Sequence, residues 1–170
     1  MIFYEACFTH GVILDTVNHY KRVKSRSTTY ENPDRLNVLL QPPFGILLND
    51  CLLSSCKLVN NSTKATLSDI LRVHEYGYVK DVKERCEELK RNDIQTVKYD
   101  SDTYISQGTY NSSLQAVGCV MDAVDMLAKG DDCRNAFVAV RPPGHHVGSS
   151  GKVKYGYNHL ILILLFLNLL

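Results

Sequence analysis

Two amphipathic segments in the middle of the chain show the clearest pattern of apolar and polar positions. From Tyr78 to Lys90, apolar residues recur at the spacing of one helical face, and opposite charges lie four residues apart on the other face. The apolar residues are Val79, Val82, Cys86 and Leu89, and the charged pairs are Lys80 with Glu84 and Lys83 with Glu87. From Thr109 to Lys129 a longer apolar stripe ends at Gly130, a residue that suits the position after a helix. The stripe comprises Leu114, Val117, Val120, Met121, Val124, Leu127 and Ala128. Both segments are predicted to be helices.

Shorter patterns predict the elements around these two helices. Thr66-Leu67-Ser68-Asp69 resembles a capping box with Asp in place of Glu, and predicts a short helix through Val73. His74, which follows, is predicted to be a structural histidine with a hydrogen bond near a helix end. A further helix is predicted to begin at 31–36 and to end before Pro42. Residues 1–30 predict a short strand and a loop, residues 92–108 predict a loop, and residues 46–59 fit either a helix or a strand.

An uninterrupted apolar run, Ala136 to Val140, predicts a strand buried on both faces inside a parallel sheet. Pro142 and Pro143 end this strand, because neither can donate a hydrogen bond to a neighbouring strand. His145 and His146 then follow the carboxyl end of a central strand, where open α/β sheets bind their ligands. The order helix, short link, strand, loop is typical of the α/β class.

Composition narrows the class of protein. A chain of 170 residues with 45% hydrophobic and 22% charged residues is typical of one globular domain. Its 19 basic and 18 acidic side chains nearly balance, so direct binding to nucleic acid is not expected. Six cysteines without a CxxC pair indicate reduced thiols inside the cell. The apolar tail Leu160–Leu170 is shorter than the roughly twenty residues of a membrane span, so membrane insertion is not expected.

The histidine pair is the main candidate for chemistry. Imidazole titrates near working pH, so two adjacent histidines suit general acid–base catalysis or metal binding. A solvent-facing turn without special chemistry is an equal alternative on the local residues alone. No HExxH, HxxxH or Asp-x-His pattern supplies further metal ligands in this chain. The residues by themselves therefore predict half of a catalytic site.

The segment Val140-Arg141-Pro142-Pro143-Gly144-His145-His146 resembles the signature of the zinc-dependent histone deacetylases, in the form used by their class II branch. Pro33-Asp34-Arg35-Leu36, Val73-His74 with Tyr78-Val79, and Asp100-Ser101-Asp102-Thr103-Tyr104 follow the family's order. The resemblance implies an α/β fold with an arginase-like parallel sheet flanked by helices. It covers most of residues 1–148, which we expect to be the N-terminal part of a deacetylase domain. Gly148–Gly151 are expected to be a flexible loop, and residues 149–170 are expected to be a divergent apolar tail.

The resemblance also implies roles for individual residues. His146 would be the general base that deprotonates a water molecule and the acid that protonates the leaving lysine amine. His145 would be its partner, which stays protonated longer. Asp102 would be a rim acid that accepts hydrogen bonds from the substrate backbone. Tyr157 would form an aromatic wall of the acyl-lysine tunnel, and Arg35 would lie near the cavity through which acetate leaves.

Zinc is the cofactor that the resemblance implies, but this chain has no counterpart of the family's zinc ligands. The implied substrate is an acetylated histone or another acetyl-lysine protein, and the implied partner is a corepressor-type complex in the nucleus or cytoplasm. We therefore expect a truncated deacetylase domain that is inactive alone. The alternative is a non-catalytic protein-interaction module derived from a deacetylase.

Overall fold

The structure of the chain is a computed structural model. It describes residues 2–4, 34–40, 45–48, 58–59, 63–99, 103–129, 135–142 and 147–151.

Three short strands form a parallel sheet. Strand β1 (Ile2–Tyr4) lies between β2 (Leu58–Val59) and β5 (Phe137–Ala139), with Ile2 opposite both Leu58 and Phe137. The predicted N-terminal strand and the predicted 136–140 strand are thus confirmed as parallel neighbours. Within the undecided stretch 46–59, the structure has a 3-10 turn, η1 (Ile46–Leu48), before β2.

One detail of the β5 prediction is wrong. Among the described strands β1 lies between β2 and β5, so β5 has one described neighbour. Phe137 is 52% exposed, so β5 is not buried along its whole length, although Ala139 is 5% exposed. The apolar run predicted a strand correctly, but a run of this kind does not reveal how much of each residue is buried.

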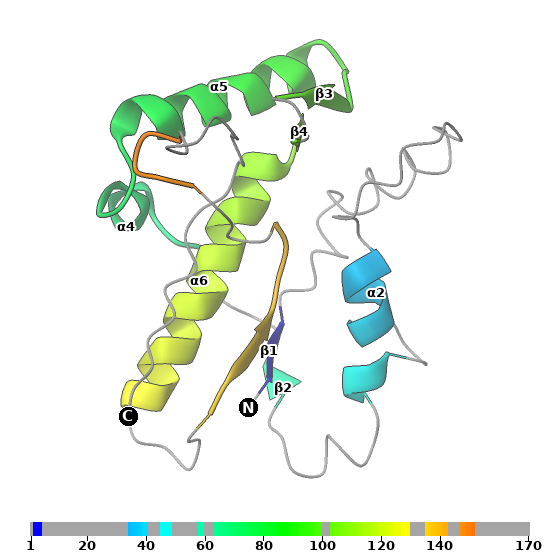
Figure 1. Cartoon of the computed structure of the whole chain (residues 1–170), viewed down its shortest axis with the longest axis vertical. Coiled ribbons are helices and arrows are strands. Elements are labelled where there is room, and N and C mark those ends of the chain that lie inside the picture. Colours follow the sequence, from blue (N-terminus) through cyan, green and yellow to red (C-terminus); the bar gives the residue numbers. More distant parts are fainter. Residues whose placement is uncertain are drawn as a thin grey trace.

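Helices pack on both faces of β5 (Figure 1). On one face Ala139 contacts Leu36 and Leu40 of α2 (Asp34–Leu40), the helix predicted before Pro42. On the other face Val138 and Val140 pack against α6 (Thr109–Ala128). Successive strand residues point to opposite faces, so a strand between two helices needs apolar residues at consecutive positions. This arrangement confirms the helix-flanked α/β architecture.

The long helix α6 is confirmed, but its predicted apolar stripe is not its most buried face. Val120 is buried, four further stripe residues are partly buried, namely Leu114, Val117, Val124 and Leu127, and Met121 and Ala128 are exposed. The other buried residues are small or polar: Ser112, Ser113, Gln115, Ala116, Gly118, Cys119 and Ala123. Small side chains allow the helix to approach a neighbouring backbone closely, and at Gly118 a Cβ would overlap the carbonyl oxygen of Thr63.

Helices α4 (Leu67–Leu71) and α5 (Tyr76–Arg91) confirm the other amphipathic predictions. The capping box at Thr66 is present in both directions, although α4 ends two residues before Val73. The predicted apolar face of α5 is buried in one cluster with Tyr78 and Ile105. The charged pairs also form, with Lys80 3.7 Å from Glu84 and Lys83 3.9 Å from Glu87.

The prediction of a loop over 92–108 is wrong. Strand β3 (Thr96–Lys98) pairs antiparallel with β4 (Tyr104–Ser106), and the amide of Tyr99 donates to the carbonyl of Thr103 at 2.8 Å. Ile105 is fully buried in the core cluster beside α5. Each strand has only three residues, too few for an alternating pattern to emerge from a polar segment. Packing of Ile105 stabilises a hairpin that local sequence does not reveal.

Candidate functional site

The predicted site residues lie mainly outside the described part of the chain. His145, His146, Asp102 and Tyr157 belong to segments that the structure does not describe, and for Arg35 only the backbone, within α2, is described. The described residues nevertheless define what precedes and follows the histidine pair.

The entry to the histidine pair is β5. Pairing with β1 holds its backbone, and packing of α2 and α6 holds its two faces. Arg141 and Pro142, joined by a cis peptide bond, continue from its carboxyl end. Because α2 contacts Ala139, the helix that carries Arg35 lies against the strand that leads to the histidines. The fold thus places α2 against β5, the strand that precedes the histidine pair in the sequence.

The exit from the histidine pair is the segment 147–151, which we call the exit segment. Val147 packs against the core cluster of α5, and the amide of Glu75 donates to the carbonyl oxygen of Ser149 at 2.8 Å. The hydroxyl of Ser149 lies 3.4 Å from the carboxylate of Glu75, to which it donates. Gly151 is buried against the ring of Tyr78 with φ of +74°. A segment that reads as a plain Gly-Ser loop is therefore docked on the start of α5.

Glu75 and Tyr78 were missed as possible contributors to the site. Tyr78 has its place in the family's order, after Val73-His74, but no predicted role. A further signal is indirect, since Gly151 follows the histidines and a glycine often marks a positive φ or a close approach. The contact partner of that glycine is 73 positions away in the sequence and is defined only by the fold.

His74 is buried, with 4% of its surface exposed, and its ring meets that of Tyr78 edge to face at a centroid distance of 5.4 Å. Its structural role is consistent with this packing. Its backbone amide donates to the carbonyl oxygen of Ile70 at 3.0 Å, at the end of α4, whereas neither ring nitrogen has a hydrogen-bond partner among the described residues. The His74 side chain thus contacts Tyr78 through ring packing.

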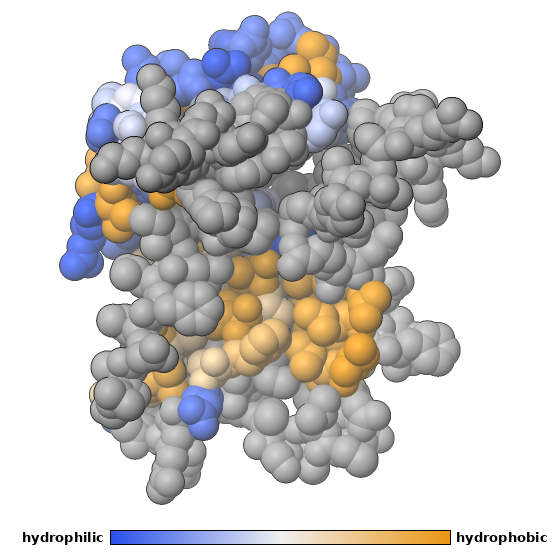
Figure 2. Space-filling model, in the orientation of Figure 1, coloured by the Kyte–Doolittle hydropathy of each residue, from blue (hydrophilic) through white to orange (hydrophobic). Residues whose placement is uncertain are grey.

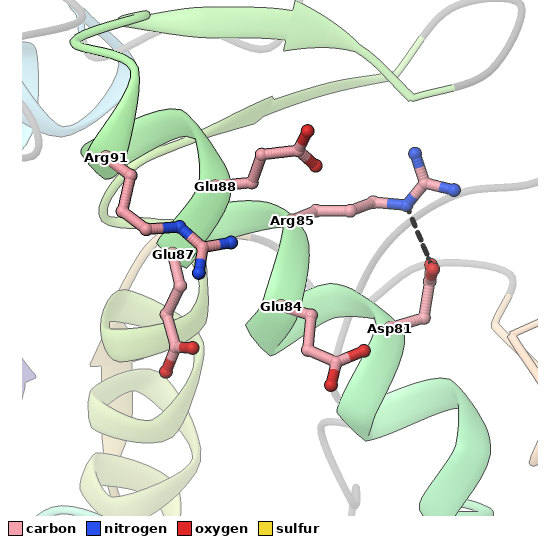
Figure 3. Close-up of a pocket in the computed structure, with 6 residues that line it drawn as sticks. All are labelled: Asp81, Glu84, Arg85, Glu87, Glu88 and Arg91. Carbon is pink, nitrogen blue, oxygen red and sulfur yellow. Dashed lines mark hydrogen bonds and ion pairs between the residues drawn. The ribbon is translucent and has the colours of Figure 1, made fainter.

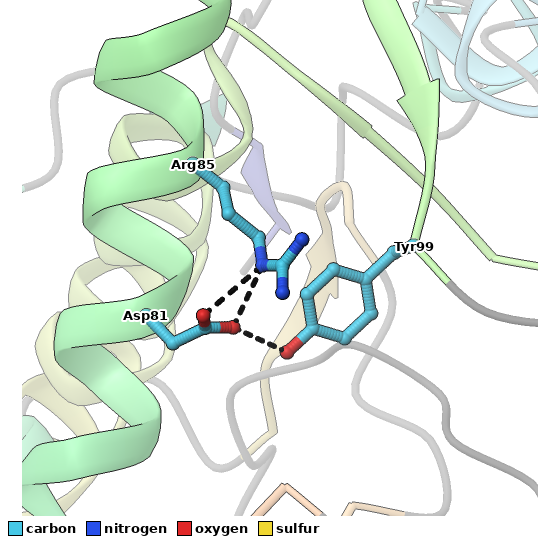
Figure 4. Close-up of polar contacts among 3 residues, drawn as sticks. All are labelled: Asp81, Arg85 and Tyr99. Carbon is cyan, nitrogen blue, oxygen red and sulfur yellow. Dashed lines mark hydrogen bonds and ion pairs between the residues drawn. The ribbon is translucent and has the colours of Figure 1, made fainter.

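A polar network holds the β3–β4 hairpin against α5 (Figure 4). The Arg85 guanidinium donates to the Asp81 carboxylate at 2.9 Å, and the Tyr99 hydroxyl donates to the same carboxylate at 3.0 Å. The Arg85 guanidinium also lies 5.1 Å from the centre of the Tyr99 ring. The ion pair with Asp81 raises the pKa of Arg85, so the cation stays charged. Tyr99 directly precedes residues 100–102, which include Asp102.

The outer face of α5 forms an open pocket of about 430 Å³ (Figure 3). It is lined by Asp81, Glu84, Arg85, Glu87, Glu88 and Arg91. All six side chains come from one helix, and their charges are mixed. A solvated helical face of this kind explains the pocket without a ligand.

Comparison with known proteins decides the family. The profile of the family described as "Histone deacetylase domain" matches residues 29–159. This chain belongs to the histone deacetylase family. An uncharacterized protein of Methanocaldococcus jannaschii is 30% identical over 129 residues, which cover 76% of this chain and 33% of that protein. A probable deacetylase of Archaeoglobus fulgidus is 37% identical over 83 residues, covering 49% of this chain and 21% of that protein.

A solved structure agrees with the family assignment. The crystal structure of the HDA15 HD domain superposes with a TM-score of 0.59 at 26% identity, covering 75% of this chain and 33% of that chain. The match confirms the predicted arginase/deacetylase-like α/β fold. This chain thus spans about a third of the length of the Methanocaldococcus protein and of the solved deacetylase domain.

The histone deacetylase family is zinc-dependent. Within the ranges that the structure describes, no group of three His, Cys, Asp or Glu side chains could hold a metal ion. The described residues therefore do not fit a zinc site.

Among the described helices, none is long and apolar enough to cross a membrane.

Proposed function

We propose that this chain supplies the general acid–base segment of a lysine deacetylase, which hydrolyses the amide of an acetyl-lysine protein such as a histone. His146 takes a proton from the attacking water and then donates it to the nitrogen of the leaving lysine, while His145 stabilises the charge that develops. The Arg-Pro-Pro-Gly-His-His segment, within the range matched by the family profile, is the observation that supports this proposal. Because the described residues offer no zinc site, the proposal concerns proton transfer only.

The remaining site residues receive supporting roles under the same proposal. Asp102 belongs to the short segment between the ends of the hairpin, Tyr99 and Thr103, where a carboxylate suits hydrogen bonds from a substrate backbone. Arg35, on the helix packed against β5, contributes positive charge near the path by which acetate leaves. Tyr157 forms an aromatic wall for the acyl-lysine chain.

We further propose that the 170-residue chain is inactive alone and that residues 1–148 are the N-terminal part of a deacetylase domain. A catalytic zinc needs about three protein ligands, and the sequence pairs its histidines with no Asp-x-His or related ligand pattern. Zinc-dependent hydrolysis of an acetyl-lysine peptide by the purified chain would refute this part of the proposal.

The acid–base role is tested in a chimera, in which residues 29–159 replace the corresponding segment of the probable deacetylase of Archaeoglobus fulgidus. We expect the chimera to hydrolyse an acetyl-lysine peptide, and we expect His146→Ala to reduce kcat by about 100- to 10,000-fold. His145→Ala should have a smaller effect, with an unchanged zinc content in both variants. A folded, zinc-loaded chimera that keeps its activity after His146→Ala would overturn the assignment.

A second candidate function, a protein-interaction module without catalysis, is favoured by one observation. Figure 2 shows apolar surface over α2, η1 and β5, where Val38, Ile46 and Phe137 are 58%, 55% and 52% exposed. Exposed apolar areas of this kind often bind other proteins. This function requires a stable 170-residue product in cells, and its absence from a cell extract would exclude it.

A further inference from the structure

We propose that the start of α5 is a positioning element for the histidine pair, in which Glu75 and Tyr78 fix the exit segment that follows His146. The inference rests on the proposed function, because it assigns these residues to the acid–base site. Glu75 and Tyr78 are positioning residues rather than catalytic residues, since they act through residues 147–151.

The first contact is a pair of hydrogen bonds between Glu75 and Ser149. The Glu75 amide donates to the Ser149 carbonyl at 2.8 Å, and the Ser149 hydroxyl donates to the Glu75 carboxylate across 3.4 Å. Glu75 is the N-cap residue of α5 and makes no side-chain cap hydrogen bond to its own helix. Amides at a helix start lack partners within the helix, so a carbonyl from a distant segment satisfies one of the groups that the helix leaves open. This contact ties the exit segment to a rigid helix.

The second contact is the packing of Gly151 on the ring of Tyr78. Gly151 has φ of +74°, and its amide closes a turn by donating to the carbonyl of Gly148 at 3.1 Å. A Cβ at this position would overlap the edge of the ring and lie 2.9 Å from Cγ of Tyr78. Tyr78 is 8% exposed and is braced by the edge of the His74 ring, so it has little space to move. Glycine is therefore required here by both the backbone angle and the contact.

The two contacts matter for the histidines because of chain length. Only residues 143–146 separate the described entry, which ends at Pro142, from the exit segment, which begins at Val147. The entry is held by the pairing of β5 with β1, and the exit is held by Glu75 and Tyr78. A short segment tied at both ends samples far fewer conformations than one tied at a single end. Releasing the exit segment should therefore alter the surroundings of His145 and His146 while the helices stay folded.

The test is a comparison of imidazole resonances by NMR in the 170-residue chain. Gly151→Ala disturbs the contact with Tyr78, and Ser149→Ala removes the hydroxyl from the contact with Glu75. Gly77→Ala, in the first turn of α5, is the matched control, because a Cβ there meets no atom within 4 Å. Far-UV circular dichroism checks that the total helix content is retained in each variant.

We expect Gly151→Ala to shift or broaden the assigned ring resonances of His145 and His146 by more than one line width. Ser149→Ala should move the same resonances less, with an unchanged unfolding midpoint, and Gly77→Ala should leave them unmoved. Unmoved His145 and His146 resonances in a folded Gly151→Ala chain would overturn the proposal. If Gly151→Ala does not fold, Ser149→Ala is the deciding variant: unmoved His145 and His146 resonances in that folded variant would overturn the proposal. The NMR measurement tests the positioning role, and the activity of the chimera tests the proposed function. Failure of one proposal can therefore be distinguished from failure of the other.

Discussion

Replacing Gly118 with alanine should destabilise the protein strongly, although alanine is the better helix former. The added Cβ would overlap the carbonyl oxygen of Thr63 and lie 2.9 Å from the nitrogen of Ala65. Both are backbone atoms, so no side-chain rotation can relieve the overlap. Two hydrogen bonds also fix this segment on α6: Thr63 N–H donates to the Asp122 carboxylate at 2.7 Å, and Ala65 N–H donates to the Leu114 carbonyl at 3.1 Å.

The change in the free energy of unfolding combines two destabilising contributions and one stabilising contribution. Overpacking costs about 1–3 kcal/mol, and each hydrogen bond weakened by movement of α6 costs about 1 kcal/mol. The higher helix propensity of alanine offsets about 1 kcal/mol of this. The net loss in the free energy of unfolding is about 2–4 kcal/mol, and each kcal/mol lowers the melting temperature of a domain of this size by about 2–4 °C.

The assay is urea unfolding followed by far-UV circular dichroism, with Gly77→Ala as the control. Both substitutions add one methyl group to a glycine in a helix, but Gly77 has open space around it. Gly77→Ala should therefore raise the free energy of unfolding by about 0.5–1 kcal/mol. If Gly118→Ala is as stable as Gly77→Ala, then α6 does not approach the 63–65 backbone as closely as the structure indicates.

Two further predictions concern polar contacts. The Thr66 hydroxyl and the Thr66 backbone N–H both donate to the Asp69 carboxylate, and these hydrogen bonds lower the pKa of Asp69 below its ordinary value of 3.8. The ionised carboxylate therefore stabilises the fold above pH 3.8, and this stabilisation is lost as the pH falls through the lower pKa of the folded state. Asp69→Asn should therefore flatten the acid limb of the unfolding midpoint measured against pH, and an unchanged limb would contradict the capping box. Tyr99→Phe removes the hydrogen bond to Asp81 but keeps the ring beside Arg85, and should lower the free energy of urea unfolding by about 0.5–1.5 kcal/mol. Tyr76→Phe, at a site 60% exposed, should have no effect, and equal stability of the two variants would show that the Tyr99 contact contributes nothing.

Elements with a strong local signal were predictable. The α5 helix was evident because its apolar residues and its opposite charges repeat at the helical period, and the structure buries the former and pairs the latter. The capping box of α4 was evident because Thr66 and Asp69 interact within one turn. In contrast, the β3–β4 hairpin was missed, since its stability comes from burial of Ile105 among residues of other elements.

The same division applies to the site. A contiguous motif was enough to predict the histidine pair, its place after a strand, and the family. Such a motif depends only on neighbouring residues, so the sequence shows it directly. The α/β class was likewise predictable from the order of helices and strands along the chain. Which face of α6 is most buried depends on tertiary contacts, because the closeness of a helix to a distant backbone favours small side chains over large apolar ones. The tertiary structure alone placed Glu75 and Tyr78 beside the exit segment, because contacts between residues more than 70 positions apart depend on the path of the whole chain.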